Sequence, residues 1–433
     1  MIIGIRREDK SPWEARSPIT PEHAARLIDE HGLEIRIQPS DQRIYSSEEY
    51  IEAGATVTDD LSPCEVILGV KEMPGHFFER GKTYVFFSHT IKGQPYNMGM
   101  LRKMMQLECN LIDYETITDD AGRRLVFFGV HAGLAGMIDS LWALGRRLQV
   151  EGRQTPLLRI TPAHQYESLK AAKRELAEVA TDIANSEALA GCGPIVCGFA
   201  GYGRVAEGAQ EIYDIFAPKE FSPQDLSSID PAQTDGQFLK VVFKEEHMVE
   251  PVQPGGVFEL QDYYKNPQKY RGVFARYLSH LTILMNCIYW TQDYPRLATK
   301  DDIVALYEGD QRPRLKVIGD ISCDPEGSIE CMVRPTDPGN PVYVYNVDQG
   351  ATVDGFNGRG PVILAVEILP TELPREASEV FSNALLELVP ALASSNPQAD
   401  FNSWSLPGPL KRAVILHKGQ LTEKYAYIQK FLD

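Results

Sequence analysis

The segment from Pro194 to Phe216 constrains the fold of this chain more than any other. It begins with a short apolar run, residues 195–197, which is typical of a strand buried on both faces of a parallel sheet. Apolar residues then recur at spacings of four, three and four, which predicts a helix packed on that sheet. The residues of this helical stripe are Val205, Ala209, Ile212 and Phe216.

Glycines fill the turn between this predicted strand and helix, in a GxxGxG pattern with a further glycine at position 208. Residues without a Cβ allow a tight turn and let a pyrophosphate approach the free amides of a helix N-terminus. The strand before and the helix after the turn favour dinucleotide binding over a purely structural turn. We therefore expect cofactor contacts from Gly198, Gly201, Gly203, Arg204 and Val205.

An acidic residue about 20 positions further on usually binds the ribose hydroxyls in this type of fold. That window contains Lys219 and Glu220. Glu220 suits NAD, Lys219 suits the 2′-phosphate of NADP, and both residues are also compatible with solvated loop charges. The sequence leaves the choice between NAD and NADP open.

The composition indicates a two-domain protein that binds small molecules. A chain of 433 residues exceeds what one hydrophobic core normally supports. The net charge of −17 argues against nucleic-acid and anionic-membrane partners, both of which require clustered Lys and Arg. No apolar run is long enough to span a membrane, and the N-terminus becomes charged too early for a signal peptide. We expect a soluble, cytoplasmic protein.

The seven cysteines include no CxxC pair, which favours reduced thiols over disulfides or a zinc site. The predicted strand 316–319 ends in Asp320, with Asp324, Glu326 and Glu330 beyond it. Because no histidine lies among these carboxylates, we expect no metal there. A loop that lines the nucleotide site or the cleft between the domains, with Asp320 near the cofactor, is the preferred interpretation.

Strands and helices alternate in the first part of the chain, which predicts a parallel sheet. Lys71 follows the apolar run 66–70, and His89 follows the next strand, 84–88. In open parallel sheets ligands bind beyond the carboxyl ends of the strands. Both side chains are therefore candidates for chemistry, although each residue alone is also typical of an ordinary surface.

A further strand, 111–114, precedes Glu115, and a turn then leads to Arg123 and Arg124. Such a pair is usually solvated, but a guanidinium can also bind a carboxylate with two hydrogen bonds.

Helical spacing continues over 133–148, residues 157–160 resemble a strand, and 277–290 is apolar enough to be a buried helix. We place the substrate domain at 1–135 and 325–433, and the dinucleotide-binding domain at 136–324.

The chain resembles the lysine-2-oxoglutarate reductase family, also called saccharopine dehydrogenase (L-lysine-forming), over nearly its full length. It is particularly similar to the reductase half of aminoadipate-semialdehyde synthase. The stretches that carry the resemblance are Glu14–Arg16 with Thr20 and Pro21, Lys71–Pro74, the FFSHTIKGQ run, Gly122–Arg124 with Phe128 and Gly129, His131–Met137, Gly201–Gly208, Ile288–Trp290, Pro295–Leu297, Asp320–Ser322, Lys424, Tyr425 and Tyr427–Gln429.

The resemblance implies two doubly wound α/β Rossmann-like domains, like those of alanine dehydrogenase and transhydrogenase, with the active site in the cleft between them. It implies that Lys71 and His89 are the acid and base and that substrate contacts come from Arg16, Glu72, Lys92, Glu115 and Arg124. Because an acidic Glu72 beside Lys71 opposes a lowered lysine pKa, the roles of Lys71 and His89 at each proton transfer stay open.

The reaction implied is reductive condensation of L-lysine with 2-oxoglutarate to saccharopine, with hydride from NADP or NAD, NADP being slightly favoured by the resemblance. Because the chain ends at Asp433, we expect the second enzyme of the bifunctional proteins to be absent. The alternatives are another opine-type reductase, an alanine dehydrogenase-like aminase and a catalytically silent nucleotide-binding protein. A homo-oligomer is compatible with every one of these readings.

Overall fold

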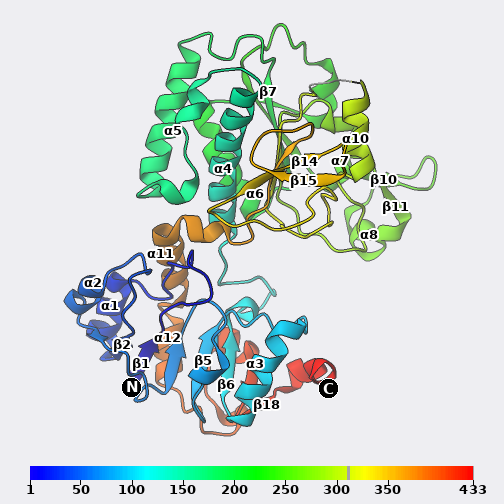
Figure 1. Ribbon diagram of the computed structural model, residues 1–433. Helices are drawn as coiled ribbons and strands as arrows, with labels where there is room; N and C mark the ends of the chain where they lie inside the picture. Colours follow the sequence, from blue (N-terminus) through cyan, green and yellow to red (C-terminus); the bar gives the residue numbers. More distant parts are fainter. Residues whose placement is uncertain (310–312, 433) are drawn as a thin grey trace. The chain divides into compact units, whose positions relative to one another are not determined.

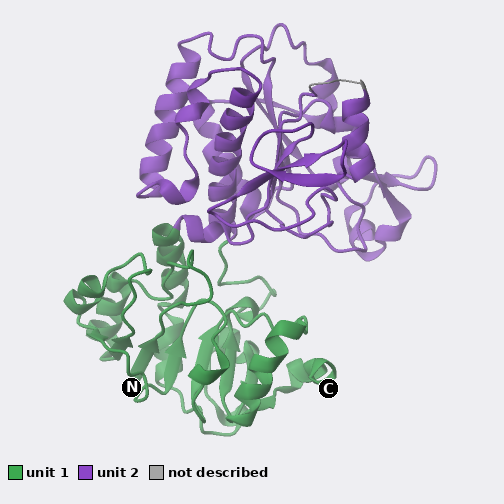
Figure 2. Cartoon of the chain, viewed as in Figure 1, with its two compact units in different colours: residues 1–128, 374–433 green, residues 129–373 purple. Residues whose placement is uncertain are grey.

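The computed structural model describes residues 1–309 and 313–432, which form two compact units (Figure 2). Unit 1 comprises residues 1–128 and 374–433, and unit 2 comprises residues 129–373. The chain thus leaves unit 1 slightly earlier than predicted. The predicted return at residue 325 is also too early, because the strands between residues 342 and 364 pair within the second sheet.

The first helix shows how local sequence sets the boundaries of an element. Helix α1 (Pro21–His31) begins after Thr20, whose side chain accepts a hydrogen bond from the amide of His23 at 3.3 Å. Pro21 suits the first helical position because its fixed φ is helical and its missing N–H has no intrahelical partner. Gly32 ends the helix in the left-handed conformation, with φ 62°. Local side-chain and backbone chemistry thus sets both ends of this helix.

An eight-stranded sheet organises unit 1, in the order β18-β17-β6-β5-β4-β1-β2-β3. The six strands β1 to β6 run parallel to one another, whereas β17 runs antiparallel to both β6 and β18. The bounds are β1 Ile2–Ile5, β2 Glu34–Ile37, β3 Thr56–Val57, β4 Val66–Leu68, β5 Thr83–Phe86, β6 Asn110–Asp113, β17 Val414–His417 and β18 Gln420–Leu421.

The parallel register brings three strand ends of unit 1 to one edge of the sheet. Leu68 of β4 lies opposite Val85 of β5, which in turn lies opposite Ile112 of β6. Residues just after these three strands are therefore neighbours. The helices of unit 1 are α1, α2 Ser47–Glu52, α3 Pro95–Gln106, α11 Pro374–Leu385, α12 Leu388–Ala393 and α13 Gly408–Arg412 (Figure 1).

Unit 2 has a second eight-stranded sheet, in the order β15-β14-β16-β13-β12-β7-β9-β8. It is parallel except for β14, which runs antiparallel to both its neighbours. The bounds are β7 Ile195–Ala200, β8 Lys219–Phe221, β9 Phe238–Phe243, β12 Ile283–Asn286, β13 Val317–Asp320, β14 Val342–Asn346, β15 Ala351–Asp354 and β16 Val362–Leu364; a separate hairpin pairs β10 Val249–Pro251 with β11 Tyr270–Gly272.

Strand β7 is buried on both faces, as its apolar run predicts. Ile195 and Cys197 belong to one hydrophobic cluster, whereas Val196 belongs to another. Because successive side chains of a strand point to opposite faces, the sheet of unit 2 lies between two cores. The helices of unit 2 are α4 Gly129–Val150, α5 Leu169–Ala184, α6 Arg204–Tyr213, α7 Glu245–Met248, α8 Leu260–Lys265, α9 Ala275–Leu278 and α10 Lys300–Gly309.

Two local predictions in unit 2 are wrong. Residues 277–290 form the end of α9 and strand β12 instead of one helix, and residues 157–160 lie largely in a 3₁₀ helix, η3 (Pro156–Arg159), instead of a strand. A short apolar run does not distinguish a buried helix from a buried strand, and pairing of β12 with β7 and β13 decides it here. Within residues 1–309 and 313–432, no helix has the length and apolar character that crossing a bilayer requires.

Candidate functional site

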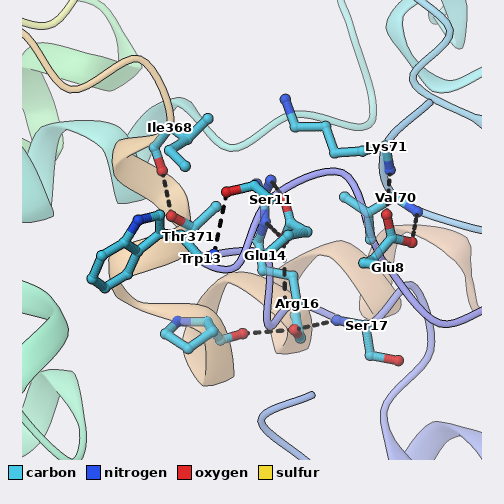
Figure 3. Close-up of polar contacts among 12 residues, drawn as sticks. Glu8, Ser11, Trp13, Glu14, Arg16, Ser17, Val70, Lys71, Ile368 and Thr371 are labelled. Atoms are coloured by element: carbon cyan, nitrogen blue, oxygen red, sulfur yellow. Dashed lines mark hydrogen bonds and ion pairs between the residues drawn. The ribbon is translucent and has the colours of Figure 1, made fainter. Parts of the chain in front are cut away.

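Lys71 lies just beyond β4 at the carboxyl edge of the sheet in unit 1. Its amide and that of Val70 donate hydrogen bonds of 2.9 and 2.7 Å to the two carboxylate oxygens of Glu8 (Figure 3). Burial raises the pKa of Glu8 to about 7, helped by the nearby charge of Glu14. Glu8 therefore fixes the backbone from which the Lys71 side chain extends.

The ammonium group of Lys71 has an unusual environment for a lysine. Its side chain is half-buried, and no side chain of the described residues forms a hydrogen bond or ion pair with Nζ. Burial lowers the pKa of Lys71, and the charge of Arg16 lowers it further, whereas Glu14 and Glu72 act in the opposite direction. The net effect is a lowered pKa, so the Lys71 ammonium gives up its proton more readily than that of a solvated lysine.

His89 follows β5 and faces the carboxylate of Glu72. Its Nδ1 lies 2.8 Å from Oε1 of Glu72, and the side chain of Asn97 donates to the backbone carbonyl of His89 at 3.2 Å. His89 has φ 48°, a conformation that costs a non-glycine residue energy and is characteristic of functional sites. The strained backbone and the two contacts fix the position of the imidazole ring.

Glu72 carries its negative charge over the whole physiological range. Burial alone would raise its pKa, but the hydrogen bond and charge of His89 and the contact with Lys10 lower it to about 2. Nζ of Lys10 lies 2.7 Å from Oε1 of Glu72. Because an ionised carboxylate only accepts hydrogen bonds, the hydrogen lies on Nδ1 of His89, and the neutral ring accepts protons at Nε2.

Asp113, at the end of β6, supports the loop that carries His89. It accepts hydrogen bonds from the hydroxyl and, at 3.1 Å, the amide of Ser88, and from the amide of Glu115 at 2.7 Å. Burial raises the pKa of Asp113 to about 6. Neither Glu8 nor Asp113 was predicted as a site residue. Their positions at or just after strand ends were the available signal.

Arg16 is buried and forms an ion pair with Glu14. Its guanidinium donates to both oxygens of Glu14, at 2.7 and 2.5 Å, and lies 4.2 Å from the centre of the Phe128 ring. This bidentate pair and the aromatic face fix the orientation of the guanidinium. Arg16 is thus a rigid positive charge whose field reaches Lys71.

The other predicted substrate contacts differ in how well they are held. Nη1 of Arg124 lies 3.9 Å from Oε1 of Glu115, and an antiparallel bridge pairs Arg124 with Thr118 across the turn between them. Lys92 is exposed in a turn. Phe431 is packed against Gly93, and the hydroxyl of Tyr427 donates to the carbonyl of Ile91 at 2.8 Å, so the C-terminal segment supports this turn.

In unit 2 the glycine turn follows β7 as predicted, but its glycines differ in role. Gly198 lies inside β7, where a Cβ would come within 2.9 Å of Leu281 and Phe243, so it serves close packing. Gly201 has φ 100°, and a Cβ at Gly203 would meet open space. Arg204 and Val205 begin α6. The amides at this helix start have no intrahelical partner and are available to an anion.

Gly208 serves the packing of two helices. A Cβ there would lie 2.1 Å from the carbonyl of Val130, and one at Gly133 would lie 1.9 Å from the carbonyl of Val205. Helices α4 and α6 therefore cross in backbone contact, and their labels lie close together in Figure 1. The segment from Gly201 to Val205 fits a pyrophosphate that requires close backbone approach.

Lys219 and Glu220 are not brought to the glycine turn. Strand β8, which contains them, lies at the edge of the sheet beyond β9, and Glu220 is level with Cys197 of β7. Two strand spacings separate Glu220 from β7, roughly 10 Å. Its carboxylate pairs with Lys240 at 2.8 Å. The expected distance of about 20 residues from the glycine turn therefore does not identify the ribose ligand in this chain. The reason is that β8, the strand that follows α6 in sequence, is not the neighbour of β7.

Asp320 lies in a buried polar cluster at the carboxyl ends of β12 and β13. Nδ2 of Asn286 donates to Asp320 at 2.8 Å, to Ser322 at 3.0 Å and to Ser328 at 2.7 Å. Burial raises the pKa of Asp320 to about 7. Oδ1 of Asn286 and Oδ2 of Asp320 are buried without a partner among the described residues, which is compatible with a ligand at this sheet edge.

Comparison with known proteins connects this geometry with a family. Residues 4–135 match the family described as alanine dehydrogenase/PNT, N-terminal domain. Over 99% of its length the chain is 36% identical to alpha-aminoadipic semialdehyde synthase of Arabidopsis thaliana, and it covers 41% of that protein. The chain is homologous to the saccharopine dehydrogenases.

A relative of similar length gives a second match. Saccharopine dehydrogenase [NAD(+), L-lysine-forming] of Yarrowia lipolytica is 29% identical over 89% of this chain and 90% of its own length. Among solved structures, L-alanine dehydrogenase matches the whole of both chains with a TM-score of 0.64 at 15% identity, which confirms the two-domain α/β fold. The chain spans less than half of the plant relative.

Proposed function

We propose that this protein is an NAD(P)-dependent oxidoreductase that condenses L-lysine with 2-oxoglutarate to give saccharopine, and that it catalyses the reverse reaction. The observation that carries the proposal is a half-buried Lys71 without a side-chain partner in the described chain, beside a His89–Glu72 pair at the next strand end. Similarity over 99% of this chain to alpha-aminoadipic semialdehyde synthase, and over 89% to a saccharopine dehydrogenase, supports the choice of substrates.

The reaction needs several proton transfers that this pair can perform. The ε-amine of lysine must lose a proton before it adds to the ketone of 2-oxoglutarate, and the hydroxyl that forms must gain one to leave as water. Nε2 of His89 accepts a proton and returns it, with Glu72 stabilising the imidazolium that forms. Lys71, with its lowered pKa, serves as the second proton donor and acceptor.

Cationic groups of unit 1 suit the carboxylates of both substrates. Arg124 is the more exposed candidate, and its partner Glu115 holds it at 3.9 Å. Arg16 contributes a buried positive charge near Lys71. The segment Gly201–Val205 would hold the pyrophosphate of the dinucleotide, and the nicotinamide would supply the hydride that reduces the imine.

An assay of reduced nicotinamide consumption tests the proposal. The purified chain is mixed with NADH or NADPH and with lysine and 2-oxoglutarate, together and separately. We expect oxidation only when both substrates are present, with saccharopine detected as the product by mass spectrometry. The fold likeness to L-alanine dehydrogenase provides the second candidate, reductive amination of pyruvate by ammonia. Oxidation with that pair alone would replace the lysine assignment.

A further inference from the structure

Strand β9 occupies the place next to β7 where a dinucleotide fold binds the adenosine ribose. The two strands are parallel, Ala200 lies opposite Phe243, and the amide of Gly201 donates to the carbonyl of Phe243 at 3.0 Å. In such folds the residue that binds the ribose hydroxyls follows the strand adjacent to the glycine turn. Here that position belongs to Lys244 and Glu245, not to Glu220.

The Glu245 side chain is held at the glycine turn by two phenols. The hydroxyl of Tyr202, which lies between Gly201 and Gly203, donates to Glu245 at 3.2 Å, and the hydroxyl of Tyr264 in α8 donates at 2.6 Å. Both tyrosines remain partly exposed, at 47% and 45%. The carboxylate is thus fixed beside the turn, and its remaining acceptor positions are available to vicinal hydroxyls.

No cation of the described residues forms an ion pair with Glu245. Arg204, at the start of α6, pairs with Glu207 at 3.2 Å, and Lys240 pairs with Asp214 and Glu220. Exposed Lys244 and exposed Glu246 flank Glu245 in the same turn, so residues 244–246 carry a net negative charge. A 2′-phosphate carries between one and two negative charges and would be repelled at this place, whereas ribose hydroxyls would be bound.

We propose that Glu245 binds the adenosine ribose hydroxyls and makes this protein selective for NAD(H) over NADP(H). The inference rests on the proposed function only in requiring that a dinucleotide binds at the glycine turn. This selectivity differs from the slight preference for NADP that the family resemblance implies. The residue that determines it lies further along the sequence than the usual distance of about 20 residues from the glycine turn.

Direct binding measurements test this assignment without catalysis. The full chain is titrated with NADH and NADPH, and dissociation constants are determined by nicotinamide fluorescence and calorimetry. We expect the wild type to bind NADH at least tenfold more tightly. Glu245→Gln removes the charge but keeps the shape, so it should weaken NADH binding, strengthen NADPH binding and bring the ratio of the two constants close to one.

Glu220→Gln is the matched control, because it makes the same change on the edge strand β8. It should leave the NADH to NADPH ratio unchanged. A wild type that binds NADPH as tightly as NADH, or a ratio that changes in Glu220→Gln and not in Glu245→Gln, would overturn the Glu245 assignment and leave the reductase proposal intact. If neither NADH nor NADPH binds, both proposals are overturned together.

Discussion

Nδ1 of His89 lies 2.8 Å from Oε1 of Glu72, and this contact joins the segments that follow two neighbouring parallel strands. Glu72 directly follows Lys71, so three ionisable groups with different charges share one sheet edge. Burial and Arg16 lower the pKa of the lysine, and His89 and Lys10 lower that of the carboxylate. Glu72 therefore stays ionised at neutral pH, whereas Lys71 gives up its proton more readily than a solvated lysine.

Glu72→Gln should destabilise the protein in a pH-dependent way. Since folding lowers the pKa of Glu72 from 4.5 to about 2, its stabilising effect is present above pH 4.5 and is lost as the pH falls towards 2. We expect the variant to be less stable at pH 7, on the order of 3 kcal/mol, with the difference shrinking in acid. Urea unfolding measured against pH checks this. Equal stabilities at pH 7 would contradict it, and exposed Glu52→Gln is the control.

Lys71→Met should abolish most of the activity without unfolding unit 1. Loss of a proton donor and acceptor costs about 10²–10⁴-fold in kcat. Because burial disfavours the charged ammonium, stability should be retained or increased. Steady-state kinetics and thermal unfolding on the same sample separate the two effects. Lys103→Met, on the exposed side of α3, provides the control, and a variant with unchanged kcat would exclude Lys71 from the chemistry.

Neighbouring arginines offer a matched test of carboxylate binding. Arg124 lies near Glu115, whereas Arg123 is 82% exposed and pairs with Asp119 at 2.7 Å. We expect Arg124→Gln to raise KM for 2-oxoglutarate about tenfold or more, since a hydrogen bond to a charged group contributes about 1.5–3 kcal/mol. Arg123→Gln should leave KM unchanged. Equal effects of the two substitutions would indicate general electrostatic attraction instead of a specific contact.

Two substitutions in the glycine turn should separate binding from stability. A Cβ at Gly203 meets no atom within 4 Å and φ is −83°, so Gly203→Ala should leave folding intact while weakening dinucleotide binding. Gly201 has φ 100° and a Cβ there would lie 3.2 Å from Ile288, so Gly201→Ala should also destabilise unit 2, by about 1 kcal/mol or more.

Isothermal titration and chemical unfolding of both glycine variants provide the measurements. Gly99→Ala, in helix α3 where a Cβ has open space, is expected to leave binding unaltered. Full affinity in Gly203→Ala would show that no ligand approaches the backbone at this position.

Glu372 in unit 2 should make stability fall as the pH rises. It is buried near Asp139 and accepts a hydrogen bond from the amide of His164 at 3.3 Å, and burial raises its pKa from 4.5 to about 7. The neutral form contributes stability below pH 4.5 that is lost as the pH rises through 7. Glu372→Gln stays neutral, so unfolding experiments should show a smaller loss of stability between pH 5 and 8. An unchanged pH profile would contradict this, and exposed Glu387→Gln serves as the control.

Local sequence chemistry accounts for several elements. Thr20, Pro21 and Gly32 set both ends of α1, and the apolar run before Gly201 and the stripe after it gave β7 and α6. Lys71 and His89 were placed at strand ends because a parallel sheet brings such positions to one edge. These features depend on neighbours within a few residues, so a single sequence contains the information.

The errors share a physical cause, which is pairing between segments distant in sequence. Residues 277–290 contain a strand because β12 is sandwiched between β7 and β13, and residues 342–364 stay in unit 2 because β14 and β16 extend its sheet. The supporting role of Glu8 requires the first strand to lie beside β4.

The sequence by itself determined that a glycine turn follows a buried strand, that Lys71 and His89 end neighbouring strands, and to which family the chain is related. Only the tertiary structure decided which strand adjoins that turn, and it places Glu245, not Glu220, beside Gly201. The reason is that turns and caps arise from contacts over a few residues, whereas the order of strands in a sheet is set by packing of the whole domain.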